Sequence, residues 1–178
     1  MTARAAATSG MIVAIVIALG GCSAPLIPQG WGSWERVGVT GTPTPIPGHE
    51  EPFRASYVNP VGETARPTVE GGVTKTLYPP GSVIVKAGFR GSVAPGPAET
   101  PAKLYAMVKR PDDPRARGGW VWVVRNGNDP REIVVDAPYC VDCHGYANAP
   151  NPYGDKNPNR EYRDYVFLPY RAAGQQAE

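Results

Sequence analysis

The chain has 178 residues, 42% of them hydrophobic, which is enough for one globular domain with a core of its own. Its formal net charge is +2 and the charged residues are scattered along the chain, so the charge pattern does not indicate a nucleic-acid partner. The 21 glycines and 21 prolines interrupt any long helical pattern and exclude a helix bundle. We therefore expect a mainly β protein of short strands joined by many turns.

Residues 1–21 are predicted to be a signal peptide of the lipoprotein type. An apolar stretch of nine residues (11–19) lies behind a basic start, and residues 19–22 (LGGC) resemble a bacterial lipobox. Such a short stretch cannot cross a bilayer as a mature helix. We expect Cys22 to become the lipidated first residue of a periplasmic protein, and Ser23 behind it favours anchoring in the outer membrane. A plain secretory peptide, cut near the same place, is the alternative.

The exported chain is expected to start with a flexible tether over residues 22–33. Prolines and glycines prevent regular structure there, and only Trp31 could pack against a core. A single domain over residues 34–170 and a C-terminal tail over residues 171–178 are predicted to follow.

The first predicted element of this domain is a short helix from Trp34, capped by Ser33 and ended by Gly38. Residues 41–52 hold four prolines and are predicted to be an extended loop. Runs rich in β-branched and aromatic residues then predict six strands, whose order favours an antiparallel meander. These strands are residues 53–58, 82–87, 103–109, 120–125, 132–135 and 165–168.

The most informative motif is Cys140-Val141-Asp142-Cys143-His144. Two thiols at this spacing on the first turn of a short helix match the two vinyl groups of a porphyrin, and the adjacent imidazole can ligate the iron. The motif predicts one covalent heme c, attached through Cys140 and Cys143, with His144 as a metal ligand. A redox dithiol and a zinc site are the alternatives. The pair lies far from any early βαβ unit, and only His49 and Cys22 remain as further nitrogen or sulfur donors for zinc.

The rest of the chain offers few candidates for a second axial ligand. Met1 and Met11 leave with the signal peptide, and no Met or His follows His144. Met107 is expected in the core of a strand, and His49 lies in the proline-rich loop, where we expect it to be exposed. We therefore expect a five-coordinate iron with one open face, which binds or transforms a small molecule such as nitric oxide, hydroxylamine or peroxide.

Four blocks of the chain, in this order, resemble the cytochrome P-460 family and its relative cytochrome c′-beta. The blocks are Trp34 to Val39 leading to Arg54 to Pro60, then Pro80 to Lys86, then Lys103 to Lys109 followed by Gly119 to Trp122, and lastly the heme motif followed by Asp164 to Phe167. They cover most of residues 34–170. The resemblance implies an antiparallel β domain, commonly a homodimer, with the heme between the sheet and the short helix that carries the cysteines.

In the cytochrome P-460 members, a lysine is covalently joined to a meso carbon of the porphyrin, and the proteins oxidise hydroxylamine. Lys86 occupies that position here. In a strand from Ser82, Ile84 and Lys86 share one face, so the amine could point wherever Ile84 packs. A lysine exposed at the end of its strand is the alternative. Attack on the porphyrin needs a neutral amine, which burial beside apolar groups favours.

Two further residues are candidates for catalytic roles. Arg54 matches a family arginine and could donate hydrogen bonds to a bound nitrogen oxide or to a heme propionate, whereas a surface cation is the alternative. Asp136 precedes Cys140 by four residues and could take protons from hydroxylamine in the pocket, whereas a solvated turn aspartate is the alternative.

The sequence leaves three functions open. The first is an enzyme that oxidises hydroxylamine and passes electrons to a periplasmic acceptor. The second is a nitric-oxide-binding protein of the cytochrome c′-beta kind, without turnover, and the third is an electron carrier with His49 or Met107 as sixth ligand. Residues 145–163 form a longer connection than the family usually has, which could cover the pocket mouth or dock the electron acceptor.

Overall fold

The computed structural model describes residues 24–41, 47–91, 95–96, 99–136, 138–152 and 156–167. The predicted signal peptide (1–21), Cys22 and the predicted tail (171–178) lie outside the described residues. No helix in the described ranges is long and apolar enough to span a membrane.

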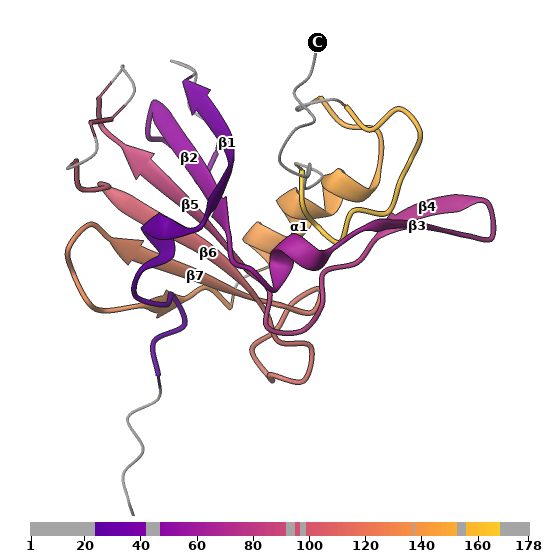
Figure 1. The fold of residues 1–178 in the computed structure, drawn as a ribbon, viewed down its shortest axis with the longest axis horizontal. Helices are drawn as coiled ribbons and strands as arrows, with labels where there is room; N and C mark the ends of the chain where they lie inside the picture. The colour runs from indigo at the N-terminus through magenta and orange to yellow at the C-terminus, as the bar shows by residue number, and fades with distance from the viewer. Residues whose placement is uncertain are drawn as a thin grey trace, which may run out of the picture.

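The main sheet has six antiparallel strands in the order β1-β2-β5-β6-β7-β8 (Figure 1). Its strands are β1 (Glu35–Gly41), β2 (Phe53–Val58), β5 (Val83–Phe89), β6 (Lys103–Lys109), β7 (Trp120–Asn126) and β8 (Ile133–Val134). A hairpin of β3 (Pro67–Glu70) and β4 (Val73–Thr76) projects from the sheet between β2 and β5, and the only α-helix of the described residues is α1 (Tyr139–Gly145). Short 3-10 helices are η1 (Trp31–Ser33), η2 (Gly62–Thr64) and η3 (Tyr146–Asn148). The mainly β fold and the short helix on the cysteine motif are confirmed.

Two element predictions are wrong. Trp34 is extended and β1 starts directly behind it, because pairing with β2 overrides the weak helical pattern. Of the strand predicted at residues 165–168, the described residues 165–167 form a turn and a bend: Asp164 and Tyr165 have φ of 50° and 68°, a left-handed conformation that cannot continue a strand. The β3–β4 hairpin was not predicted, although Gly71-Gly72 between its strands is a typical hairpin turn.

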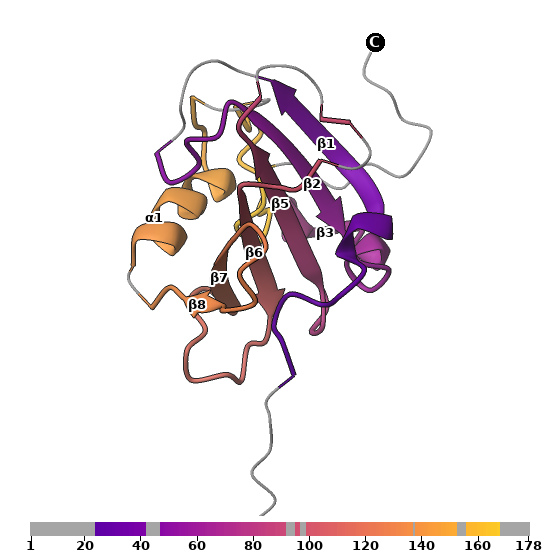
Figure 2. The same ribbon diagram turned by 90° about the vertical axis from the view of Figure 1, so that its left-hand side faces the viewer.

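The tether prediction is wrong for residues 26–33, which pack on the domain. Leu26 and Ile27 are buried in the core, and their backbone N–H groups donate to the carboxylate of Glu132 over 2.7 and 2.8 Å. Figure 2 shows this N-terminal segment running along the main sheet, apart from α1. The folded unit therefore begins before Trp34.

The two faces of the sheet differ in chemistry because successive side chains alternate across it. One face is aliphatic and forms the main core with Ile27; its members include Ala55, Val85, Leu104 and Val121. The opposite face carries the residues in between, which are larger or polar. They are Arg54, Ser56, Ile84, Lys86, Tyr105, Met107 and Trp122. This second face is the one that looks toward α1.

The contacts of Glu132 give a test of the N-terminal packing. Glu132→Ala should lower the free energy of unfolding by about 2 kcal/mol, because two backbone N–H groups lose a charged acceptor. Urea unfolding measures this loss, and limited proteolysis should cut within residues 24–33 faster than in the parent protein. Asp129→Asn is the matched control, since Asp129 bonds within its own exposed turn to Arg131. Equal losses in the two variants would contradict the packing.

Candidate functional site

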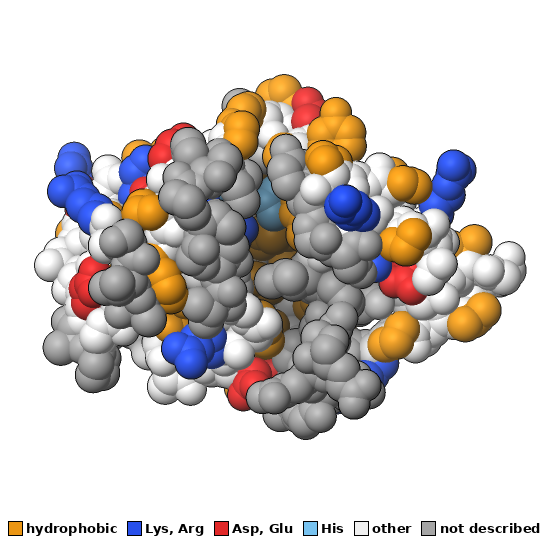
Figure 3. All heavy atoms as spheres, turned by 90° about the horizontal axis from the view of Figure 1, so that it is seen from above, with side chains coloured by type: hydrophobic (Ala, Val, Ile, Leu, Met, Phe, Trp, Pro, Cys, Tyr) orange, Lys and Arg blue, Asp and Glu red, His pale blue; other side chains and the backbone are white. Residues whose placement is uncertain are grey.

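A cavity of about 650 Å³ lies between the polar face of the sheet and α1. Figure 3 shows the hollow from above, with a histidine side chain and hydrophobic side chains inside it. Strands β2, β5, β6 and β7 supply one wall, and α1 supplies the other. A cavity of this size takes a cofactor or a drug-sized ligand.

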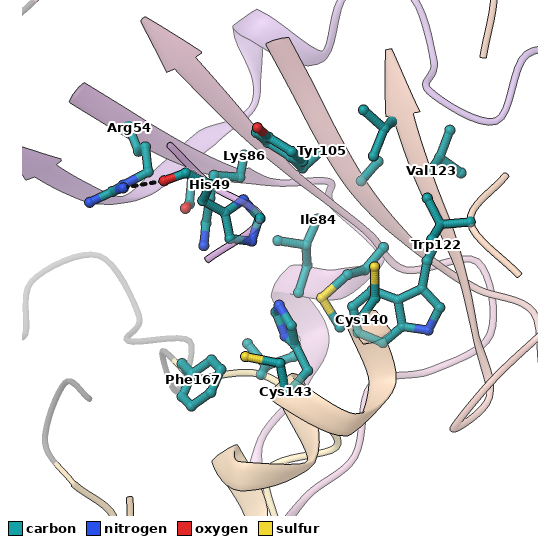
Figure 4. Close-up of a pocket in the computed structure, with 18 of the residues that line it drawn as sticks. His49, Arg54, Ile84, Lys86, Tyr105, Trp122, Val123, Cys140, Cys143 and Phe167 are labelled. Atoms are coloured by element: carbon teal, nitrogen blue, oxygen red, sulfur yellow. Dashed lines mark hydrogen bonds between the residues drawn. The ribbon is translucent and has the colours of Figure 1, made fainter. Parts of the chain in front are cut away.

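Helix α1 presents both thiols of the motif to the cavity. Cys140 and Cys143 line it, are partly buried and are not joined by a disulfide. Figure 4 shows them on the helix, opposite Lys86 and His49. Burial, followed by the neighbouring Cys143, raises the pKa of the Cys140 thiol. Both sulfur atoms therefore lie on one wall of the cavity with no bond between them.

His144 is oriented by a hydrogen bond to the backbone. Its Nδ1 lies 2.8 Å from the carbonyl oxygen of Tyr165, and because a carbonyl only accepts, Nδ1 carries the proton. The ring packs against Trp122 and Phe167, with centroids 4.8 and 5.3 Å away. Burial and the charge of Lys86 lower the pKa of His144 to about 4. The imidazole is thus neutral, with its Nε2 lone pair available to a metal ion.

A buried carboxylate fixes the segment that holds His144. Asp164 is 1% exposed, accepts from Lys109 Nζ over 2.6 Å and from the backbone N–H of Tyr78 over 3.0 Å. The indole of Trp120 donates to the Asp164 carbonyl over 2.9 Å. These contacts hold the left-handed backbone at Asp164 and Tyr165, which turns the Tyr165 carbonyl toward His144.

Lys86 projects from β5 into the cavity. It lies between Ser56 and Tyr105 of the neighbouring strands and lines the same space as the two cysteines. Burial, followed by the charge of Arg54, lowers the pKa of Lys86 to about 8. The structure therefore places a partly buried amine opposite the cysteine helix, not the exposed lysine of the alternative interpretation.

Arg54 also lies in the cavity wall and is only 2% exposed, so it is not a surface cation. Its Nη1 donates to the backbone carbonyl of His49 over 2.6 Å. The guanidinium therefore contributes positive charge beside Lys86 and supports the loop that carries His49 (Figure 4).

His49 is partly buried, and the expectation that it is exposed is wrong. Its ring lines the cavity, 4.3 Å from the ring of Tyr105 and 6.3 Å from that of His144, measured between centroids. Burial, then the charges of Lys86, His144 and Arg54, lowers the pKa of His49 to about 2. Met107 lies in the core as expected and also borders the cavity. Sequence reasoning missed His49 because a proline-rich loop carries no periodic signal of burial.

Residues 28–168 match the family model of cytochrome P-460. The chain belongs to the cytochrome P-460 family. No curated protein matches the chain. Membership in this family implies heme binding and is associated with heme oxidoreductase activity.

The cavity of this cytochrome P-460 member fits a heme by its donor set. One wall holds two free thiols and a neutral imidazole fixed through Nδ1, and the other holds apolar side chains together with the cations Arg54 and Lys86. A zinc site is not supported: within the part of the chain that the structure describes, no three His, Cys, Asp or Glu side chains come together.

Asp136 is not brought to the cavity. Its side chain is 66% exposed and pairs with Arg117, and it is not among the lining residues. Proximity in sequence to Cys140 suggested a pocket carboxylate, but the chain turns before α1 and leaves Asp136 in solvent. The solvated turn aspartate, the alternative for this residue, describes it.

The Asp164 ion pair gives a test of how His144 is held. Asp164→Asn should lower the free energy of unfolding by about 3 kcal/mol, because the ammonium of Lys109 then stays buried without its counter-charge. The double variant with Lys109→Met should recover part of this loss, since no unpaired charge remains. Urea unfolding of the single and double variants measures both effects. Strictly additive losses would contradict the coupling.

Proposed function

We propose that this protein is an exported c-type heme enzyme that oxidises hydroxylamine. One heme is held by thioethers to Cys140 and Cys143, with His144 on the iron and Lys86 bonded to the porphyrin. The observation that carries this proposal is that the partly buried Lys86 lines the same cavity as the cysteine helix. Membership in the cytochrome P-460 family supports it.

The thiols need only addition chemistry. Each S–H bond of Cys140 and Cys143 adds across one vinyl group, so a C–S bond and a C–H bond form and no oxidant is consumed. Helix α1 sets the spacing, and the Tyr165 carbonyl fixes the His144 tautomer so that Nε2 faces the metal side.

The Lys86 bond requires a neutral amine and an oxidant. With a pKa of about 8, roughly a tenth of the amine is neutral at pH 7, which is about 300-fold more than for an ordinary lysine. Forming the N–C bond removes one hydrogen from nitrogen and one from the meso carbon, and a peroxide of the hydrogen peroxide class would accept both and be reduced to water. The burial of Lys86 is what makes its nitrogen a nucleophile.

The remaining cavity groups suit a small polar substrate. A bound heme would supply one-electron redox chemistry at its iron. The Arg54 guanidinium can donate hydrogen bonds to the oxygen of hydroxylamine, and the apolar side chains of Ile84 and Met107 limit the water around it. Electrons would leave to a periplasmic acceptor, for which the long connection over residues 145–163 is a candidate docking site.

The second candidate is nitric oxide binding without turnover, of the cytochrome c′-beta kind. It is favoured by the mostly apolar cavity, which suits a small uncharged gas. The two candidates differ at Lys86, since only the enzyme is expected to use the bond to the porphyrin.

We infer a periplasmic protein anchored to the outer membrane through lipidated Cys22, and a homodimer. Finding Cys22→Ser in the same membrane fraction as the parent protein would contradict the anchor, and a single-chain mass in solution would contradict the dimer.

Intact mass and absorption of the purified holoprotein test the enzyme. We expect the mass of the chain plus one heme less two hydrogens, a Soret band of the reduced protein shifted far to the red, and turnover of hydroxylamine. Lys86→Met should restore the two hydrogens, remove the shift and lower the turnover at least 100-fold while the heme stays attached.

Lys75→Met is the matched control, because Lys75 lies on the projecting hairpin and pairs with Glu70. It should keep the mass, the shift and the turnover. An ordinary c-type spectrum with bound nitric oxide and no turnover in the parent protein would replace the enzyme by the gas-binding candidate.

A further inference from the structure

We propose that His49 is the second axial ligand of the heme iron in the resting protein, on the side opposite His144. The proposal rests on the heme attachment proposed above. The resting iron would be six-coordinate, instead of five-coordinate with one open face as the sequence predicts. Hydroxylamine or nitric oxide would then have to replace His49 before it could bind.

The spacing of the two imidazoles carries the inference. Their ring centroids are 6.3 Å apart. Two imidazole nitrogens bound at about 2 Å on opposite sides of one metal ion bring the ring centroids about 6 Å apart. A histidine that only donates a hydrogen bond to a small iron-bound ligand must leave room for that ligand and for the hydrogen bond. Its ring centroid would then lie roughly 8 to 9 Å from that of the ligating histidine. The observed distance matches direct ligation.

The loop that carries His49 is anchored on both sides of the cavity. Gly48 has φ of +79°, and a Cβ at this position would lie 3.1 Å from the ring of Tyr139, the first residue of α1. The loop thus approaches the heme helix so closely that glycine is required. From the sheet, Arg54 donates to the His49 carbonyl over 2.6 Å.

The ring of His49 is positioned by a second layer. Tyr105 packs edge-on against it at 4.3 Å, and the Tyr105 hydroxyl donates to Glu51 over 2.8 Å. Glu51 in turn fills the space over Gly88, where a Cβ would lie 2.7 Å from its side chain. Tyr105 of β6 and Arg54 of β2 therefore contact His49 directly, and Glu51 supports Tyr105.

The hydrogen bonding of His49 points to a partner outside the protein. Its Nδ1 is buried and, among the described residues, finds no hydrogen-bond partner. Leaving a buried imidazole nitrogen without a hydrogen bond is unfavourable, so a histidine with a purely structural role would be expected to have a partner there. Figure 4 shows the ring of His49 pointing into the cavity, toward the helix that carries Cys143. The iron would lie in the space between this ring and the helix.

The spin state of the ferric holoprotein tests this inference without reference to turnover. The parent protein should show the electron paramagnetic resonance and absorption spectra of a low-spin, six-coordinate heme. His49→Ala should become high-spin, and added imidazole should restore the low-spin spectrum. His49→Phe, which keeps a ring against Tyr105, should also be high-spin and guards against a packing defect in the alanine variant.

Glu50→Gln is the matched control, because Glu50 neighbours His49 but its side chain is exposed and should leave the spectrum low-spin. A high-spin parent protein would overturn the inference, and so would a low-spin spectrum that survives in His49→Ala and His49→Phe. If the low-spin spectrum survives in both His49 variants but is lost in Lys86→Met, Lys86 is the ligand instead.

The two proposals fail separately. A high-spin parent protein that turns over hydroxylamine would remove His49 from the iron and leave the enzyme standing. A low-spin parent protein whose His49→Ala variant is high-spin, but which neither carries the Lys86 bond nor turns over hydroxylamine, would keep the ligand and favour an electron carrier.

Discussion

Alternation along the central strands is the constraint on which the rest of the structure depends. Each of β2, β5, β6 and β7 sends every second side chain into an aliphatic core and the others toward α1. A shift of one residue would exchange the two sets, so the register that buries Val85 also places Lys86 in the cavity. Core packing and site geometry are thus one property of the sheet.

The second face is unusual because it buries positive charge. Arg54 and Lys86 lie on adjacent strands, where Lys86 is opposite Ser56 and Arg54 is opposite Gly88, and both residues face the cavity. Burial, followed by the charge of Arg54, disfavours the charged form of Lys86, which is an energetic cost for the folded chain. A heme carries two anionic propionates and an electrophilic ring edge, so a bound heme could offset this cost. Burial, followed by the charge of Lys86, also keeps His144 and His49 neutral, as metal ligands must be.

Much of the fold could be predicted from the sequence because its signals are local. The strand at residues 103–109 has the bounds of β6, and the spacing of Cys140 and Cys143 predicts the helix that carries them. The face of Lys86 follows from the strand period alone. Tertiary contacts decide the other cases. Pairing with β2 makes a strand of residues 35–41.

The errors at the site have the same origin. His49 packs against Tyr105, and the neighbouring Gly48 lies beside Tyr139; both tyrosines are far away in the chain, so the loop gives no sign of the cavity. Asp136 lies close to Cys140 in sequence, yet it turns to Arg117 and the solvent. Asp164 and Tyr165 have a left-handed backbone, which the ion pair of the buried Asp164 side chain with Lys109 stabilises. The hydrophobic residues that follow resemble a strand in sequence, so the turn was not predicted. In each case the deciding partner is remote in sequence.

A crystal structure of the holoprotein, at a resolution that shows the porphyrin atoms, tests the account most directly. The account predicts one heme in the cavity between the sheet and α1, with thioethers to Cys140 and Cys143, Nε2 of His144 on the iron and continuous density from Lys86 to the ring. A heme whose ring lies outside this cavity, or a Lys86 amine turned away from the porphyrin, would contradict it.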